Sequence, residues 1–220
     1  MRNIVVFGTS DSSQLVKHYI DSDPAYSNFR IVCFTVDSEF IDKDEFEGLP
    51  VIDFLEILEK FPPEENLLFI PITGTGMNRV RMEKYSQGKE MGYQFFSYVS
   101  SRATVLTEEI GENCFILEDN TIQPFVSVGN NVVMWSGNHI GHHSKIGDHV
   151  YFTSHVVLSG HCEVGDFSWL GVNSTIREYC NIGESTLIAM GSLITKDTDP
   201  NSLYMGSPAK KQAKSPMEVI

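Results

Sequence analysis

The stretch from Ile140 to Leu158 reads IGHHSKIGDHVYFTSHVVL, and a large apolar residue recurs in it at every sixth position. Counting by six in both directions from Ile140 gives fifteen consecutive apolar residues with no insertion. Because 41% of the chain is apolar, chance would produce such a run on the order of once in a million trials. The fifteen residues are Ile110, Ile116, Ile122, Val128, Met134, Ile140, Ile146, Phe152, Leu158, Val164, Leu170, Ile176, Ile182, Ile188 and Ile194.

The fifteen apolar residues form an axial column. A small or β-branched residue often stands two positions before each of them, and we call these residues the small column; glycine often follows the axial residue directly. Ser144 and Gly147 flank Ile146 in this way. A period of six matches neither the helical repeat of 3.6 nor the strand repeat of two. It predicts a chain that runs straight, turns a corner and repeats, so that three sides close a triangular coil. Residues i and i+18 then stack about 4.8 Å apart, and the fifteen units make five coils.

The first hundred residues carry a different pattern, in which short apolar runs alternate with helical ones. Strands are expected at 3–7, 30–36, 51–52, 67–72 and 93–99, and helices after residue 13, at 54–59 and around 82–91. This alternation predicts a small parallel α/β domain of Rossmann-like type. The expected organisation is an α/β domain over 1–103, a repeat domain over 104–200 and a tail over 201–220.

Ligands of parallel sheets bind beyond the carboxyl ends of the strands. Those ends carry Gly8-Thr9-Ser10, Asp37 and Gly74. Glycine permits close backbone approach and a helix N-terminus favours phosphate, so these residues are candidates for binding a nucleotide. Plain turns remain the alternative for Gly8 and Gly74. The stretch GTSDSS is not a complete GxGxxG motif, which disfavours NAD.

Composition excludes several classes of protein. The 220 residues carry a formal net charge of −13, which opposes general nucleic-acid binding. The apolar run after Asn3 is too short for a signal peptide or membrane span, so no membrane association is expected. No two of the four cysteines form a CxxC pair. A cytoplasmic protein without disulfides is therefore the expectation.

The repeat, together with the tail sequence GSPAK at 206–210, resembles the hexapeptide-repeat acyltransferases. The join to a small α/β domain is similar to one branch of them, the nucleotide-amino-sugar N-acetyltransferases of bacillosamine type and the sialic-acid O-acetyltransferases. Further matching stretches are IVVFG at 4–8, the Val36-Asp37 pair, KEMGYQFFSYV at 89–99 and IGHHSKIGD at 140–148. The resemblance implies a left-handed parallel β-helix that works as a homotrimer with acetyl-CoA.

The resemblance also implies roles for individual residues. His142 falls on the general base, and His143 stands where an acidic residue usually orients that base. Gly160, one coil later, matches a backbone donor to the thioester carbonyl. By the same resemblance, Val172, Met190 and Pro208 of the matching tail are expected to bind acetyl-CoA, and Gly8, Thr9, Ser10 and Asp37 the nucleotide-linked amino sugar. The residues alone add Gly74 and Asn138 as candidates for the sugar nucleotide, and Lys210 as a cation for the CoA phosphates or a solvated terminus.

The residues themselves suit this chemistry. Acetyl transfer to an amine needs a base, an oxyanion donor and a groove for the thioester, and an ordinary imidazole, with a pKa of about 6.5, suits the first task. His142 lies two residues past an axial position and so points outward, and its i+18 neighbour is Gly160. Asn138 is expected as an outward-facing amide near them, either binding substrate or capping a turn.

Five of the seven histidines lie between His139 and His155, which raises a metal site as a rival. We expect no metal, because adjacent His142 and His143 should point in divergent directions and no acidic residue stands at ligand spacing. The favoured function is an acetyl-CoA-dependent N-acetyltransferase acting on a nucleotide-linked amino sugar in bacterial surface-glycan biosynthesis. The alternatives are a sugar O-acetyltransferase of sialic-acid type and a non-catalytic or metal-binding β-helix.

Overall fold

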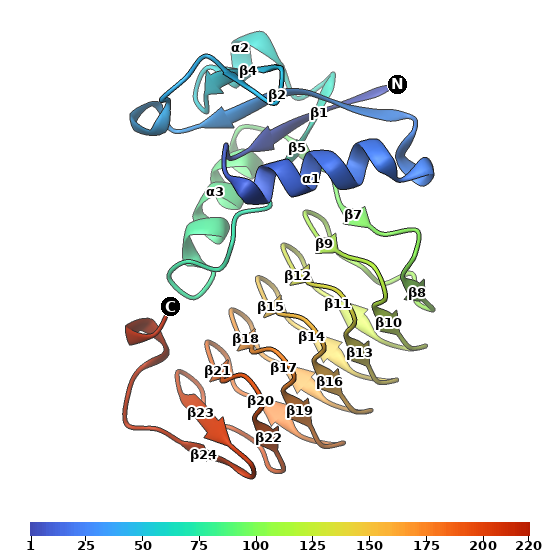
Figure 1. The fold of residues 1–220 in the computed structure, drawn as a ribbon, viewed down its shortest axis with the longest axis vertical. Coiled ribbons are helices and arrows are strands. Elements are labelled where there is room, and N and C mark those ends of the chain that lie inside the picture. Colours follow the sequence, from blue (N-terminus) through green and yellow to red (C-terminus); the bar gives the residue numbers. More distant parts are fainter.

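A computed structural model describes residues 1–220 as an N-terminal α/β unit on a three-sided β-helix (Figure 1). No helix is long and apolar enough to cross a membrane. The elements of the α/β unit are β1 (Arg2–Phe7), α1 (Asp11–Ser22), η1 (Pro24–Tyr26), β2 (Phe29–Val36), η2 (Ser38–Phe40), β3 (Glu45–Phe46), β4 (Leu49–Asp53), α2 (Ile57–Lys60), β5 (Asn66–Phe69), α3 (Arg79–Glu90) and β6 (Gln94–Phe95).

The α/β unit is built on one sheet with the strand order β3-β4-β2-β1-β5-β6, parallel except for β3. Central β1 is buried on both faces because its side chains alternate. Ile4 and Val6 pack on one side with Val16 of α1, whereas Val5 and Phe7 pack on the other. Helix α2 is shorter than the helix predicted over 54–59. The strands predicted at 3–7, 30–36, 51–52 and 67–72 match β1, β2, β4 and β5 to within three residues at each end.

The strands of the β-helix are two residues long, apart from those in the tail. They are β7 (Tyr98–Val99), β8 (Thr104–Val105), β9 (Phe115–Ile116), β10 (Thr121–Ile122), β11 (Ser127–Val128), β12 (Val133–Met134), β13 (His139–Ile140), β14 (Lys145–Ile146), β15 (Tyr151–Phe152), β16 (Val157–Leu158), β17 (Glu163–Val164), β18 (Trp169–Leu170), β19 (Thr175–Ile176), β20 (Asn181–Ile182), β21 (Leu187–Ile188), β22 (Leu193–Ile194), β23 (Leu203–Gly206) and β24 (Ala209–Lys211), and η3 (Pro216–Glu218) follows.

These strands form three faces, as the repeat predicts. The first face contains β7, β9, β12, β15, β18, β21, β23 and β24, the second β8, β10, β13, β16, β19 and β22, and the third β11, β14, β17 and β20. Ile122 pairs with Ile140 and Ile140 with Leu158, so the vertical register is the predicted 18 residues.

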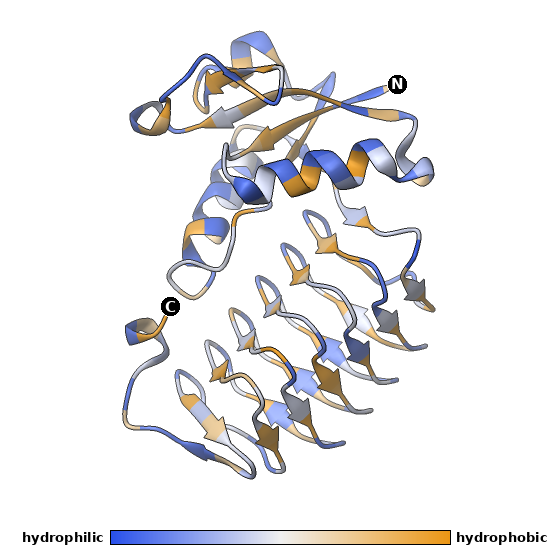
Figure 2. Cartoon of the chain, viewed as in Figure 1, coloured by the Kyte–Doolittle hydropathy of each residue, from blue (hydrophilic) through white to orange (hydrophobic).

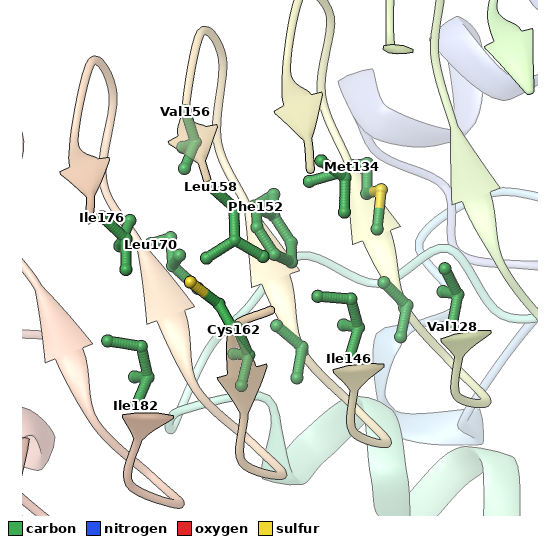
Figure 3. Packing of buried hydrophobic residues seen from close by; sticks show 14 of the residues in the cluster. Val128, Met134, Ile146, Phe152, Val156, Leu158, Cys162, Leu170, Ile176 and Ile182 are labelled. Atoms are coloured by element: carbon green, nitrogen blue, oxygen red, sulfur yellow. The ribbon is translucent and has the colours of Figure 1, made fainter. Parts of the chain in front are cut away.

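The axial column fills the interior. Every member from Ile116 to Ile194 belongs to one buried apolar core, and Ile110 packs against its end. Figure 3 shows these side chains pointing inward from successive coils, and Figure 2 shows hydrophobic strands repeating along the prism. The small column is buried at the turns, where Ser144 donates a hydrogen bond to the Ser159 carbonyl. The predicted assignment of both columns is therefore confirmed.

Three corners separate the faces, and each is named here by what it carries. The tail corner, between the first and second faces, contains 117–120, 135–138, 153–156, 171–174 and 189–192. The histidine corner, between the second and third faces, contains 123–126, 141–144, 159–162 and 177–180. The docking corner, between the third and first faces, contains 129–132, 147–150, 165–168 and 183–186. The third residue of most turns has positive φ, as at His143 (60°).

The run predicted as one strand over 93–99 is two strands in two different sheets. β6 pairs with β5 in the α/β unit, whereas β7 pairs with β9 and so begins the β-helix. The boundary expected after residue 103 thus falls inside the first coil. Similarly, β23 pairs with β21 and β24 with β23, so residues 203–211 of the predicted tail extend the first face.

Helix α3 fixes the α/β unit to the docking corner through Arg81, which is fully buried. Its guanidinium donates hydrogen bonds to the carbonyl oxygens of Asn131, His149 and Ile72 at 3.1–3.3 Å. It also lies 5.6 Å over the Tyr151 ring. Burial lowers the pKa of Arg81 to about 10, so the side chain remains a cation at neutral pH, stabilised by carbonyl dipoles.

Candidate active site

The predicted base lies at the histidine corner directly above a glycine. His142 follows β13 and is exposed to solvent. A Cβ atom at Gly160 would lie 2.9 Å from Cε1, 3.1 Å from Nε2 and 3.2 Å from Nδ1 of the His142 imidazole. Gly160 is therefore required for close approach, since the imidazole ring lies in the space that any larger residue would fill.

The backbone N–H of Gly160 has no hydrogen-bond acceptor in the protein, whereas its carbonyl accepts from the Tyr179 N–H. The N–H of His142 is satisfied, because it donates to Gln123 Oε1 at 2.9 Å. An imidazole and an unpaired backbone donor thus lie on adjacent coils, an arrangement that suits acyl transfer.

The expectation that His142 and His143 diverge is wrong. Their Nδ1 atoms lie 3.0 Å apart, and their rings meet edge to face with centroids 5.2 Å apart. The reason is the left-handed backbone of His143, which turns its side chain back along the corner. An Nδ1–Nδ1 hydrogen bond needs one ring to donate and the other to accept, so only one of the two nitrogens carries the proton.

His161 lies beside this pair, and its position there was not foreseen from the sequence. Its ring stacks on that of His143 with centroids 4.8 Å apart, and it lies 5.1 Å from that of His142. The signal was present in the sequence, because residues 143 and 161 are separated by one 18-residue coil. The same column continues the stack to Phe125 on one side and Tyr179 on the other.

The remaining residues predicted to bind the acetyl donor lie elsewhere on the prism. Val172 and Met190 occupy the tail corner, are 37% and 77% exposed, and have backbone N–H groups with no acceptor in the protein. Pro208 and Lys210 belong to the β23–β24 hairpin, which continues the first face beyond Met190. A single chain therefore does not bring these four residues to the histidine corner.

The α/β unit contains a cavity of about 280 Å³ at the carboxyl ends of β1, β2 and β5. It brings together four predicted residues, Gly8, Thr9, Ser10 and Asp37. Gly8 has φ of 117°, and a Cβ there would lie 2.7 Å from Ser13 Oγ. Ser10 is the N-cap of α1, so the positive end of that helix dipole lies at this edge.

Sequence reasoning missed a cation in this cavity. Lys84 of α3 lies 2.6 Å from Asp37 Oδ1, with its Nζ 5.6 Å from the centre of the Phe7 ring. Its side chain is only 15% exposed. No local motif marks this lysine, because it reaches the cavity only through the packing of α3 against the sheet. The pair gives the cavity one acceptor and one cation.

Two predicted substrate residues have structural positions instead. Gly74 does not line the cavity; a Cβ there would lie 1.8 Å from the Trp169 ring, so the glycine is needed for packing between the two parts of the chain. Asn138 is 1% exposed rather than outward-facing. Its amide donates to the Trp135 carbonyl, and its Oδ1 accepts from the Val156 N–H at 2.8 Å. It caps the turn, because a small-column position points inward.

The cavity and the base lie on different sides of one chain. The α/β unit covers the first face, where Tyr151 and Phe115 pack beneath it, and binds the docking corner through Arg81. The histidine corner is the edge opposite that first face. A ligand in the cavity of one chain therefore cannot reach His142 of the same chain without crossing the prism.

The chain thus combines a small parallel α/β unit with a three-sided β-helix that exposes the His142 imidazole beside a free backbone donor. Solved structures share this architecture. The acetyltransferase domain of PglB from Neisseria gonorrhoeae is 21% identical with a TM-score of 0.83, covering 96% of this chain and 100% of its own. WeeI from Acinetobacter baumannii is 22% identical with a TM-score of 0.83, covering 96% and 100%.

PerB from Caulobacter crescentus, solved with CoA and GDP-perosamine, is 20% identical with a TM-score of 0.82, covering 97% of this chain and 98% of its own. At this level of identity the likenesses establish a shared fold, an α/β unit joined to a three-sided β-helix. No protein-family model and no curated protein matches the sequence.

Proposed function

We propose that this protein transfers an acetyl group from acetyl-CoA to the amine of a nucleotide-linked amino sugar. The single observation that carries the proposal is the His142 imidazole above Gly160, whose N–H is free. The structural neighbours support it, since PglB is described as having an acetyltransferase domain and a perosamine N-acetyltransferase from C. crescentus was solved with CoA and GDP-perosamine. Variants of that enzyme with one histidine replaced by asparagine or alanine were also solved.

In the proposed reaction, the amine nitrogen of the sugar attacks the thioester carbonyl while His142 takes a proton from that amine. The new C–N bond gives a tetrahedral oxyanion, to which the Gly160 N–H donates a hydrogen bond. Collapse breaks the C–S bond, and the sulfur leaves with the proton held by His142. His143 acts as a positioning residue, because its Nδ1 lies 3.0 Å from Nδ1 of His142 and accepts the N–H there. That tautomer leaves Nε2 of His142 free to act as the base.

We infer that the nucleotide binds in the cavity of the α/β unit, which we take to be a Rossmann-like domain. The strand order supports this, because the cavity lies where the chain passes from one side of β1 to the other. Asp37 offers an acceptor to a base or ribose hydroxyl, and Lys84 a cation to a phosphate.

The active enzyme is proposed to be a homotrimer, because one chain separates the parts of the site. Three prisms side by side would bring the tail corner of one chain, with Val172 and Met190, to the histidine corner of the next. Free backbone N–H groups at both positions suit the amide carbonyls of the pantetheine arm. Lys210 and the rest of the tail hairpin lie at the end of the same corner, suited to the CoA phosphates.

The test is incubation of the protein with acetyl-CoA and a panel of UDP-, GDP- and dTDP-linked amino sugars, read by mass. We expect one acetyl group added to one class of acceptor, and His142→Ala to lower kcat by about two to four orders of magnitude with CoA binding unchanged. Turnover within about threefold of wild type would remove His142 from the role of base. Acceptors with a hydroxyl in place of the amine decide between N- and O-acetylation.

A further inference from the structure

We propose that His142, His143 and His161 form a binding site for a divalent transition-metal ion of the zinc type, and that the bound ion blocks the acetyl transfer proposed above. One ligand atom from each imidazole lies within 4.8 Å of the other two. All three side chains are exposed, so an ion can reach them from solvent. The blocking effect rests on the proposed role of His142 as base, whereas the metal site does not.

The spacing of the nitrogens suits tetrahedral coordination. Zinc bound by histidine at about 2.0–2.1 Å places its ligand nitrogens about 3.4 Å apart. Nδ1 of His142 and Nδ1 of His143 already lie 3.0 Å apart. The widest pair must close by about 1.4 Å, a movement that small rotations of exposed side chains provide.

The donor set selects the kind of ion. Three imidazole nitrogens favour zinc, copper, nickel or cobalt over calcium and magnesium, which require oxygen ligands. No carboxylate belongs to the cluster. Three protein ligands leave the fourth tetrahedral position open to water.

The backbone of the β-helix places His143 and His161 side by side before any ion binds. His143 and His161 have φ of 60° and 57° at equivalent turns of adjacent coils. Their rings are the middle members of a four-ring stack, with Phe125 4.6 Å from His143 and Tyr179 4.8 Å from His161. The backbone register thus keeps both imidazoles at this corner, and rotation about their side-chain bonds brings the nitrogens to the ion without moving the backbone.

A metal ion bound at this site would prevent His142 from accepting a proton. An imidazole that donates one nitrogen lone pair to a metal carries its proton on the other nitrogen. His142 bound in this way has no lone pair for the proton of the amine. The reaction itself needs no metal, so removing the ion should restore it.

The first measurement is direct binding. Tag-free protein stripped with a chelator is titrated with Co²⁺, whose absorption bands report tetrahedral coordination, and the bound Co²⁺ is displaced by Zn²⁺. We expect one ion per chain. His161→Phe should weaken binding at least tenfold, and it should fold normally, because Phe125 and Phe167 occupy the same turn position with φ of 64° and 62°. His155→Phe, at the tail corner with φ of 59°, is the matched control and should bind Co²⁺ like wild type.

The second measurement is turnover with and without Zn²⁺. Without the ion, His161→Phe should retain activity within about threefold, since this ring has no place in the transfer. Inhibition by Zn²⁺ should require at least tenfold more ion in that variant than in wild type. Absence of Co²⁺ bands in wild type, or equal binding by the two phenylalanine variants, would overturn the metal site. Full turnover with the ion bound would leave the site standing and overturn the assignment of His142 as the base.

Discussion

Replacing Gly160 by alanine isolates the contact on which the proposed chemistry depends. The added methyl carbon would lie 2.9–3.2 Å from three atoms of the His142 ring, whereas ordinary contacts begin at 3.4 Å. The imidazole must therefore move by up to about 0.5 Å, while the backbone N–H of residue 160 stays in place. A misplacement of about 1 Å can cost on the order of a hundredfold in rate. Since the displacement here is about half of that, we expect kcat to fall about tenfold with acetyl-CoA binding unchanged.

The stability of this variant, unlike its activity, should hardly change. The displaced His142 ring is exposed, so Gly160→Ala should change the free energy of unfolding by less than about 0.5 kcal/mol. Gly141→Ala is the contrasting variant, because its Cβ would lie 2.4 Å from the Gly160 nitrogen and 2.5 Å from the Ser159 carbonyl carbon. That clash is with backbone, and we expect a loss of about 2–3 kcal/mol.

The assay combines urea denaturation with steady-state kinetics in a double-mutant cycle. In the His142→Ala background the methyl group at residue 160 has no ring to displace, so Gly160→Ala should then have no further effect on kcat. Equal losses in both backgrounds would refute the steric explanation. Wild-type turnover by Gly160→Ala would show that the ring position does not matter to the reaction.

Three further predictions concern the α/β unit and its attachment. Arg81→Met should lower the free energy of unfolding by about 3 kcal/mol or more, because buried carbonyls lose their donor; a change under 1 kcal/mol in urea denaturation would contradict this. Burial lowers the pKa of His149, whose Nδ1 accepts from Asn131 at 2.8 Å, so wild-type stability should be full above about pH 6.5 and decline below it as the unfolded chain takes up the proton. His149→Asn should flatten that decline between pH 5 and 7, and an unchanged pH profile would assign it to another group. Asp37→Ala and Lys84→Met should each raise KM for the nucleotide sugar about tenfold and leave KM for acetyl-CoA unchanged; equal effects on both constants would remove the cavity from acceptor binding.

His143 has an imidazole where an acidic side chain is expected. The resemblance noted from the sequence implies an acidic residue next to His142, whereas here a second imidazole, that of His143, lies 3.0 Å from the first. A carboxylate can only accept the proton of Nδ1, whereas an imidazole both accepts one and donates one. In the proposed reaction His143 therefore keeps the orienting contact, and in the proposed metal site it supplies a nitrogen ligand in place of a carboxylate oxygen.

The sequence alone determined the β-helix, because its period of six is a local property that recurs in every coil. The axial column from Ile116 to Ile194, the small column and the 18-residue register needed no information from distant segments. The same arithmetic placed Gly160 above His142. It also located the strand ends that carry Gly8 and Asp37, since alternating strands and helices place those ends at one edge of a sheet.

Only the tertiary structure decided how side chains meet across these elements. The convergence of His142 with His143 depends on a left-handed backbone turn, and Lys84 reaches Asp37 only because α3 packs across the sheet. Asn138 proved to be a turn cap for a related reason, since the crowded corner directs it inward. A sequence repeat determines on which face or corner, and on which coil, a residue lies. Ring orientation and contacts between distant segments are fixed instead by packing, which no period records.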